Sequence, residues 1–392
     1  MPGWAPTAGM VNSLNGENKP SAQVVAALYL GFVLTGIGTN LLGCILPALS
    51  GIWGLSDSHS GFLFAAQFAG SSTGALLMQS DLFKSIVRGY VLLILGSIAF
   101  AFCRGHLAPL ILFCYGLGLG SAMTAISMIF GRMYTTNRGA SLSLLNAFWG
   151  LGAVVCPMLA TVWERFESAN SIYLGLALAA VLPLFALALQ YRYVSQLRDE
   201  ITVVSNRHTK FSLLVPLAIF AFLYVGVESS ISGWMMTYVH RLPLASGLYA
   251  PIATSFFWIA LLVGRSVAPA VLKRISESGL LMITLCVVLV SNVMLLLSYT
   301  PAMSITSAAL AGLMLAPIFP LCLSKVLAIA SGPSESRWVF AISGLGGAVL
   351  PWMTGQVASL SGSLRTGLAV PLVAAIVMLL LQVRTQRVLG RG

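Results

Sequence analysis

One carboxylate stands out in this 392-residue sequence because of its position. Glu228 lies near the middle of the apolar segment 211–239, which is long enough to cross a bilayer, since a spanning helix needs about 20 apolar residues. It is the only acidic residue that the predicted spans place deep in the hydrocarbon. Tyr224 and Ser232 lie four residues to either side, on the same helix face. A carboxylate at that depth must face a bundle interior or an aqueous cavity.

Such a carboxyl group suggests proton chemistry. Burial without a nearby cation favours the protonated form, and a group that loads and releases a proton as its access to water changes suits proton coupling. We expect no basic residue at the same depth, which disfavours an anionic solute. Glu228 is therefore the predicted proton-coupling residue. The alternative is a carboxylic acid that only hydrogen-bonds to a neighbouring helix, with sodium coupling or no coupling in its place.

Amide and aromatic side chains also occur at mid-span depth. Amides hydrogen-bond hydroxyl groups and indoles cover C–H faces, so together they suit a small neutral polyol. Taken singly, each amide could instead join two helices, and each tryptophan could pack or lie at the membrane interface. We expect Asn146 and Trp149 to approach Trp352 and Gln356 across a central cavity. The predicted solute-binding residues are Asn40, Gln67, Asn146, Trp149, Tyr224, Glu228, Trp258, Trp352 and Gln356.

The composition indicates an α-helical protein that crosses a lipid bilayer many times. Hydrophobic residues make up 58% and charged residues 8%, whereas soluble chains carry about 25% charged residues. The apolar runs are continuous, which excludes the alternating pattern of a β-barrel. The net charge of +11 reflects topology and not nucleic-acid binding, because the basic residues gather on one side of the membrane. Those on the other side are Arg104, Arg165, Arg241 and Arg365.

Twelve spans are predicted, with both termini in the cytoplasm of a cell whose inner membrane holds the chain. They are 22–49, 58–79, 87–103, 107–132, 139–162, 170–190, 211–239, 248–271, 278–299, 303–330, 335–360 and 365–384. A polar cytoplasmic linker, 191–210, separates an N-terminal six-helix bundle (22–190) from a C-terminal one (211–384), and tails are expected at 1–21 and 385–392.

The two bundles are predicted to be repeats of one another. A shift of 190 residues aligns Gly36 with Gly226 and Gly43 with Gly233. Parallel six-helix repeats are typical of transporters whose site lies between the halves near the midplane. Within span 303–330, two prolines at 317 and 320 predict either a static kink or a hinge.

No cofactor or metal site is predicted. The six cysteines form no CxxC pair, and the four histidines are scattered at segment ends, so metal-ligand spacing is absent. The glycine-rich stretch 116–125 lies inside an apolar run with no preceding strand, which favours close helix packing over phosphate binding. No cluster of catalytic side chains shares one depth, and so an enzyme is not expected.

Several stretches resemble a known family. Residues 74–89 and 264–279 resemble the signature loop of the major facilitator superfamily, once in each half. Residues 145–157, 224–239 and 316–324 are similar to its fucose/glucose–proton symporter branch. The resemblance implies the twelve-helix major facilitator fold. Fucose permease-like proteins carry acids in the first and fourth helices, where this chain offers Asn40, Ser121, Thr124 and Ser127.

We therefore expect a secondary active transporter, a monomer, that moves a small-molecule solute, a neutral sugar, by alternating access with proton coupling through Glu228. A sugar uniporter is one alternative. An exporter of amphiphilic or drug-like compounds is another, because Phe256, Phe257 and the 15 methionines could line a greasier cavity. A membrane enzyme or sensor is the alternative from a different class.

Overall fold

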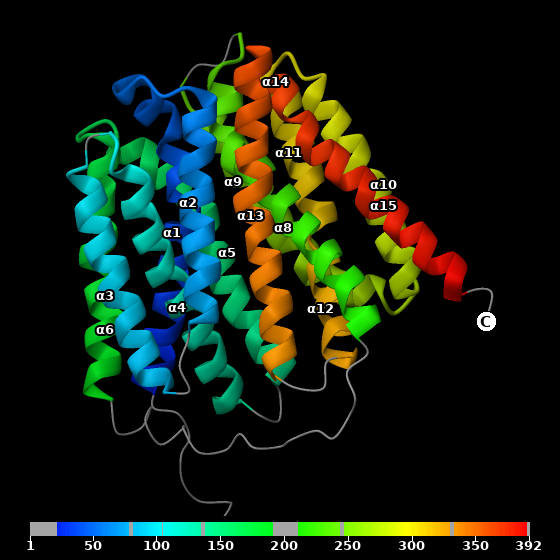
Figure 1. Cartoon of the computed structure of the whole chain (residues 1–392), viewed down its shortest axis with the longest axis horizontal. Coiled ribbons are helices and arrows are strands. Elements are labelled where there is room, and N and C mark those ends of the chain that lie inside the picture. The colour runs from blue at the N-terminus through cyan, green and yellow to red at the C-terminus, as the bar shows by residue number, and fades with distance from the viewer. Residues whose placement is uncertain are drawn as a thin grey trace, which may run out of the picture.

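The computed structural model consists of long helices that run roughly alongside one another (Figure 1). It describes residues 22–77, 81–103, 105–134, 138–190, 211–243, 247–329 and 333–389. These residues form helices and no strand, as the continuous apolar runs predict. The predicted N-terminal tail, the 191–210 linker and residues from 390 onward lie outside the described residues.

The helices before the predicted linker are called the N-terminal half here, and those after it the C-terminal half. The N-terminal half comprises α1 (Ala22–Trp53), α2 (Asp57–Leu76), α3 (Leu82–Ala101), α4 (Ala108–Met133), α5 (Arg138–Trp163), a 3₁₀ turn (Ala169–Ser171) and α6 (Ile172–Leu189). The C-terminal half comprises α8 (Phe211–His240), α9 (Tyr249–Val271), α10 (Glu277–Leu296), α11 (Pro301–Leu315), α12 (Ile318–Ile329), α13 (Pro333–Ser361), α14 (Leu364–Gly367) and α15 (Ala369–Leu389).

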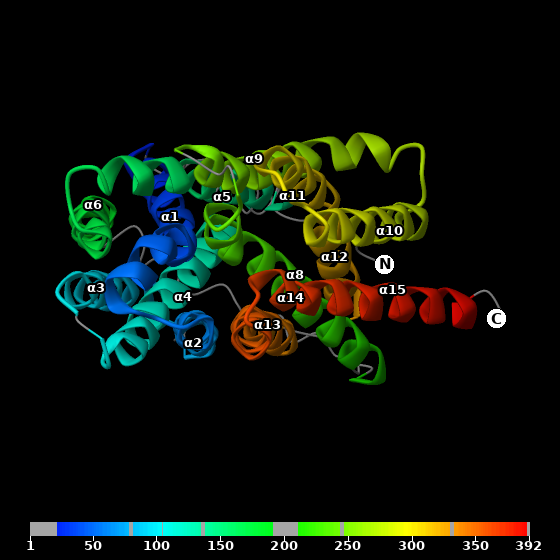
Figure 2. The ribbon, with the colours of Figure 1, turned by 90° about the horizontal axis from the view of Figure 1, so that it is seen from above.

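These helices make the twelve predicted crossings. Ten stretches of the described chain are apolar and long enough to span a membrane, with α11 and α12 counted as one stretch and α14 and α15 as another. The remaining two crossings, α2 and α13, are less apolar. They lie side by side between the halves (Figures 1 and 2), and so each has a face that contacts protein and not lipid.

The tenth crossing is broken where the prolines occur. α11 ends at Leu315 and α12 begins at Ile318, and the backbone N–H of Leu321 donates to the carbonyl of Pro317 at 3.2 Å. Proline at 317 and 320 lacks the N–H that a continuous helix needs, which accounts for the break. The single span predicted at 303–330 is therefore two helices in the structure.

Close glycine contacts confirm the internal repeat. A Cβ at Gly43 in α1 would meet the carbonyl oxygen of Gly233 in α8, so these repeat-related glycines lie against each other between the halves. Gly152 packs α5 against the backbone of α1, and Gly346 packs α13 against the backbone of α8 in the equivalent way. Each half thus uses glycine at the same helix crossing, because only a residue without a side chain permits that approach.

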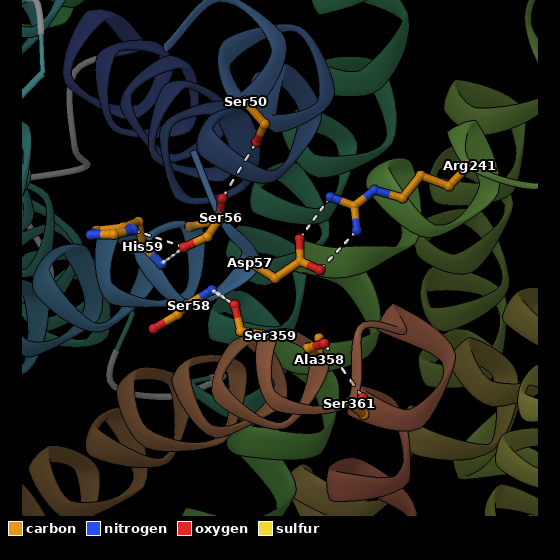
Figure 3. Close-up of polar contacts among 10 residues, drawn as sticks. Ser50, Ser56, Asp57, Ser58, His59, Arg241, Ala358, Ser359 and Ser361 are labelled. Carbon is orange, nitrogen blue, oxygen red and sulfur yellow. Dashed lines mark hydrogen bonds and ion pairs between the residues drawn. The ribbon is translucent and has the colours of Figure 1, made fainter. Parts of the chain in front are cut away.

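The halves are held together at one end of the bundle. We call it the Asp57 end, where α1 meets α2. Arg241 at the end of α8 donates from Nη1 to Asp57 Oδ2 at 2.8 Å and from Nη2 to Oδ1 at 2.6 Å (Figure 3). The backbone N–H of Ser58 donates to Ser359 Oγ on α13 at 3.0 Å. These contacts join α2 to two helices of the opposite half.

The N-terminus of α2 positions Asp57 for this role. Ser56 is the N-cap residue, and its hydroxyl accepts a hydrogen bond from the backbone N–H of His59 at 3.3 Å. A serine cap fixes the start of a helix, and an acidic side chain in the first turn is favoured by the helix dipole. The carboxylate of Asp57 is therefore held at the surface that faces α8.

Candidate functional site

A cavity of about 190 Å³ lies between the two halves. Helices α1, α2, α4 and α5 line it from the N-terminal half, and α8, α9 and α13 line it from the C-terminal half. Its wall consists of Thr39, Asn40, Gln67, Phe68, Ser71, Leu119, Met123, Trp149, Val225, Glu228, Ser229, Ser232, Trp258 and Gly344. Five of the predicted binding residues are on this wall: Asn40, Gln67, Trp149, Glu228 and Trp258.

The amides on the wall are oriented by backbone carbonyls. Gln67 Nε2 donates to the carbonyl of Thr39 at 2.9 Å, and Asn40 Nδ2 donates to the carbonyl of Gly36, also at 2.9 Å. A carbonyl accepts only, so the amide nitrogen must face it. The oxygen of Gln67 is buried and has no hydrogen-bond partner in the described structure. The N-terminal half thus contributes a lining side chain whose acceptor atom is buried and unpaired.

The acidic residue of the site belongs to a cluster of three. The hydroxyl of Tyr224 donates to Glu228 Oε2, and Arg265 Nη2 lies 3.9 Å from the same oxygen. Tyr224 is 1% exposed and is absent from the cavity wall, so it acts behind Glu228. The cluster combines a carboxylate, a phenol and a guanidinium at the junction of α8 and α9.

Arg265 corrects the expectation that no basic residue reaches the depth of Glu228. Side chains on a helix tilt toward its N-terminus, so Arg265 on α9 points back into the bundle from a Cα nearer the helix end. Its aliphatic stem can also pass apolar surface while the guanidinium reaches a polar partner. One signal was available in the sequence, because Arg265 falls six residues inside the predicted span 248–271.

Two tryptophans meet across the halves. The rings of Trp149 on α5 and Trp258 on α9 are edge to face, with centroids 5.3 Å apart and planes at 78°. Phe257 supports Trp258 with its ring centroid at 5.1 Å. About one turn before Trp258 in α9, Ser255 Oγ donates to the carbonyl of Val154 in α5 at 3.0 Å. These contacts join α5 to α9 at the cavity wall.

Besides Tyr224, three predicted binding residues are absent from the cavity wall, so the expected meeting of Asn146, Trp149, Trp352 and Gln356 at the cavity does not occur. Asn146 is exposed and bonds the carbonyl of Leu142 in its own helix at 2.8 Å. Gln356 Nε2 donates to Ser58 Oγ at 2.6 Å, at the Asp57 end. Trp352 is 38% exposed. The reason is that α13 presses against α2 at Gly61, whose Cβ would touch the Trp352 backbone, and this leaves no room for an indole ring between them.

One further acid, outside the cavity, is partly buried. Glu164 follows the last residue of α5, beyond the spanning stretch, and its Oε1 atom is buried without a hydrogen-bond partner in the described structure. Burial raises the pKa of Glu164 from its ordinary value of 4.5 to about 7. Within the described residues, no group of three or more His, Cys, Asp or Glu side chains could hold a metal ion.

Two six-helix repeats around a cavity with few charges define a transporter of small-molecule solutes that crosses the membrane many times. The chain belongs to the Major Facilitator Superfamily, whose family model matches residues 28–335. It is 22% identical over 347 residues to the glucose/mannose transporter GlcP of Bacillus subtilis, covering 83% of this chain and 86% of GlcP. This match supports the resemblance to the fucose/glucose permease-like branch.

Solved structures of transporters share the fold. The crystal structure of the transporter FucP in the outward conformation superposes with a TM-score of 0.58 at 16% identity, covering 91% of this chain and 97% of FucP. A POT family transporter in complex with 5-aminolevulinic acid superposes with a TM-score of 0.73 at 12% identity, covering 93% and 95% of the two chains. At these identities the likeness concerns the fold.

Proposed function

We propose that this chain is a secondary active transporter that moves a small neutral polar solute, a sugar, through the cavity between its halves. The observation that carries the proposal is the cavity wall, which combines two amides from the N-terminal half with hydroxyls and one indole from each half. Such a wall can hydrogen-bond the hydroxyl groups of a sugar and cover its C–H faces. The glucose/mannose transporter to which the chain is similar has a solute of this kind in its name.

The charges in the site agree with a neutral solute. Glu228 and Arg265 carry opposite charges 3.9 Å apart, so together they add no net charge to the cavity. An anionic solute would gain from Arg265 but would be repelled by Glu228, and a cation would face the reverse. A solute rich in hydroxyl groups can bind without separating the Glu228–Arg265 ion pair.

We assign the movement to the two bundles, 22–190 and 211–384, which rock against each other about the cavity. The excess of basic residues on one side supports a cytoplasmic location for both termini and the 191–210 linker. The Asp57 end then faces the outside, and its ion pair closes that side, as in an inward-facing state of an inner-membrane transporter. The break at Pro317 in the tenth crossing supplies a bend that this movement can use.

Coupling to protons rests on Glu228 in this proposal. A nearby guanidinium favours the charged form of a carboxyl group, whereas exclusion of water favours the protonated form. Whether Glu228 carries a proton therefore depends on the position of Arg265 and on the access of water to the cavity. Rocking of the halves changes water access to the cavity. Proton release and solute release are linked if both depend on that one change.

A thermal-shift screen of the purified full-length protein tests the solute class. Hexoses, nucleosides, monocarboxylates and cationic dyes are compared at equal concentration, because a ligand that binds the folded state stabilises it according to its affinity. We expect stabilisation by a hexose and none by dyes. Stabilisation confined to dyes would support an exporter of amphiphilic compounds, and stabilisation confined to carboxylates would assign the site to anions.

A further inference from the structure

Three side chains that line the cavity each carry one buried polar atom that has no hydrogen-bond partner in the described structure. The three atoms are Gln67 Oε1, Trp149 Nε1 and Trp258 Nε1. The three side chains are 1%, 9% and 2% exposed, so bulk water does not satisfy them. Buried polar groups in folded proteins are normally paired, and a group left unpaired costs free energy that a fitting ligand recovers.

The three atoms are held in place by their surroundings. The other end of the Gln67 amide is tied to the carbonyl of Thr39 at 2.9 Å, which leaves the oxygen as the free end. The two indoles pack edge to face with centroids 5.3 Å apart, and Phe257 packs against Trp258. Side chains that are already ordered lose little entropy when a ligand binds, so they can act as a template.

The chemistry of the three atoms specifies their partner. An indole N–H only donates and an amide oxygen only accepts, so a ligand that pairs all three needs two accepting positions and one donated hydrogen. We infer that Trp149 and Trp258 donate to neighbouring hydroxyl oxygens of one polyhydroxylated solute while a hydroxyl of that solute donates to Gln67. This inference rests on the proposed function and adds the hydroxyl pattern that the site selects.

Other solute classes satisfy the three atoms less well. A carboxylate offers two accepting oxygens to the indoles but no hydrogen for Gln67. An amphiphilic cation or an aromatic dye leaves the indole N–H groups unpaired. A hydroxyl group both donates and accepts, so adjacent hydroxyls on a sugar ring meet the complete requirement.

The three residues divide between the halves. Gln67 and Trp149 belong to α2 and α5, whereas Trp258 belongs to α9. A solute paired with all of them bridges the two halves at the point where α5 meets α9. The same hydroxyl pattern therefore determines affinity and holds the two halves together around the bound solute.

Binding of D-glucose and D-mannose to the full-length protein, measured by calorimetry, tests the inference, with their monodeoxy derivatives and 4-hydroxybenzoate alongside. Trp149→Phe and Trp258→Phe keep a ring but lose the N–H, and each should weaken hexose binding roughly five- to tenfold. The matched control is Trp163→Phe, which loses a hydrogen bond to Ser171 Oγ at 2.8 Å outside the cavity and should bind as the parent does.

Deoxy derivatives separate a direct contact from a change in packing. The derivative that lacks the hydroxyl paired with Trp258 should bind the parent weakly but suffer no further loss in Trp258→Phe, because the two changes remove the same interaction. Hexose binding that is unaffected by both cavity substitutions would overturn this inference and leave sugar transport standing. Binding of 4-hydroxybenzoate with no binding of either hexose would overturn both.

Discussion

The guanidinium of Arg241 and the carboxylate of Asp57 form a two-pronged ion pair across the halves, with N–O distances of 2.8 and 2.6 Å. Arg241 directly follows the last residue of α8 and Asp57 begins α2, so the pair lies where these helices reach the Asp57 end. A geometry of two parallel hydrogen bonds is specific to arginine with a carboxylate. We interpret the pair as a contact that favours the state in which this end is closed.

Removing the ion pair should open the Asp57 end more often. The side chain of Arg241 is 42% exposed, and exposed pairs contribute roughly 0.2–1 kcal/mol, so we expect Asp57→Asn to raise the open population by up to about fivefold. A cysteine at Thr39, on the cavity wall, reports this as faster labelling by an impermeant thiol reagent added outside cells.

The control for this experiment is Lys84→Gln, which removes an ion pair with Asp81 at 3.5 Å inside one half. It should leave the labelling rate unchanged. The exchanged pair Asp57→Arg with Arg241→Asp should restore protection, since it reverses the charges without removing them. If Asp57→Asn and the parent label at the same rate, the ion pair has no part in closing this end.

Filling the contact between Gly43 and Gly233 should separate the halves. A Cβ at Gly43 would meet the carbonyl oxygen of Gly233, so we expect Gly43→Ala to destabilise the closed state by about 1–3 kcal/mol through overpacking. The thermal midpoint should fall. Gly51→Ala in the same helix is the matched control, because a Cβ there meets nothing within 4 Å. Equal midpoints for the two variants would refute the close contact.

Stability should fall as the pH rises through the range in which Glu164 ionises. Burial raises the pKa of Glu164 to about 7 from 4.5, so between these values the folded state binds more protons than the unfolded state. The contribution of protonated Glu164 to the free energy of unfolding is therefore fully present below about pH 4.5. It is lost as the pH rises toward and past 7. Thermal midpoints of the parent should decline across this window more steeply than those of Glu164→Gln. Parallel curves would show that Glu164 is not buried as described.

The orientation of the chain can be tested at the predicted linker. A cysteine at Ser205 should resist an impermeant thiol reagent added outside intact cells, because the excess of basic residues predicts a cytoplasmic linker. Permeabilised cells provide the control in which labelling should appear. Rapid labelling in intact cells would reverse the assignment of the Asp57 end to the outside.

The fold could be predicted because each spanning helix is specified by one continuous run of apolar residues. Long apolar runs specify spanning helices, and repeat-related glycines such as Gly43 and Gly233 indicate the two equivalent halves. Proline at 317 marks a weak point in a helix, but a sequence does not say whether the helix bends or breaks. Here the missing N–H groups at Pro317 and Pro320 divide the crossing into α11 and α12, which are separated by two residues.

The site was only partly predictable because depth and direction are different properties. Glu228 and Trp258 could be found from their depth alone, and both line the cavity. Asn146 and Gln356 have similar depth but face other directions, which only the packing of α5 and α13 decides. Arg265 was missed for the opposite reason, since its side chain reaches further into the bundle than its Cα position indicates.

The coupling role of Glu228 can be isolated by substitution. Glu228→Gln keeps the volume of the side chain and can still accept from Tyr224, but it cannot carry a proton. We expect this variant to exchange labelled D-glucose across the membrane at a rate similar to that of the parent, since exchange needs no net proton movement. Glu164→Gln is the matched control, because it changes a partly buried glutamate outside the cavity and should leave transport unaltered.

Uptake of labelled D-glucose into proteoliposomes, driven by an imposed proton gradient, tests proton-coupled sugar transport most directly. The parent protein and Glu164→Gln should accumulate the sugar above the outside concentration, and a protonophore should abolish accumulation. Glu228→Gln should only equilibrate it, with no dependence on pH. Accumulation by Glu228→Gln equal to that of the parent would contradict coupling through this residue, and the absence of sugar movement in the parent would contradict the proposed function itself.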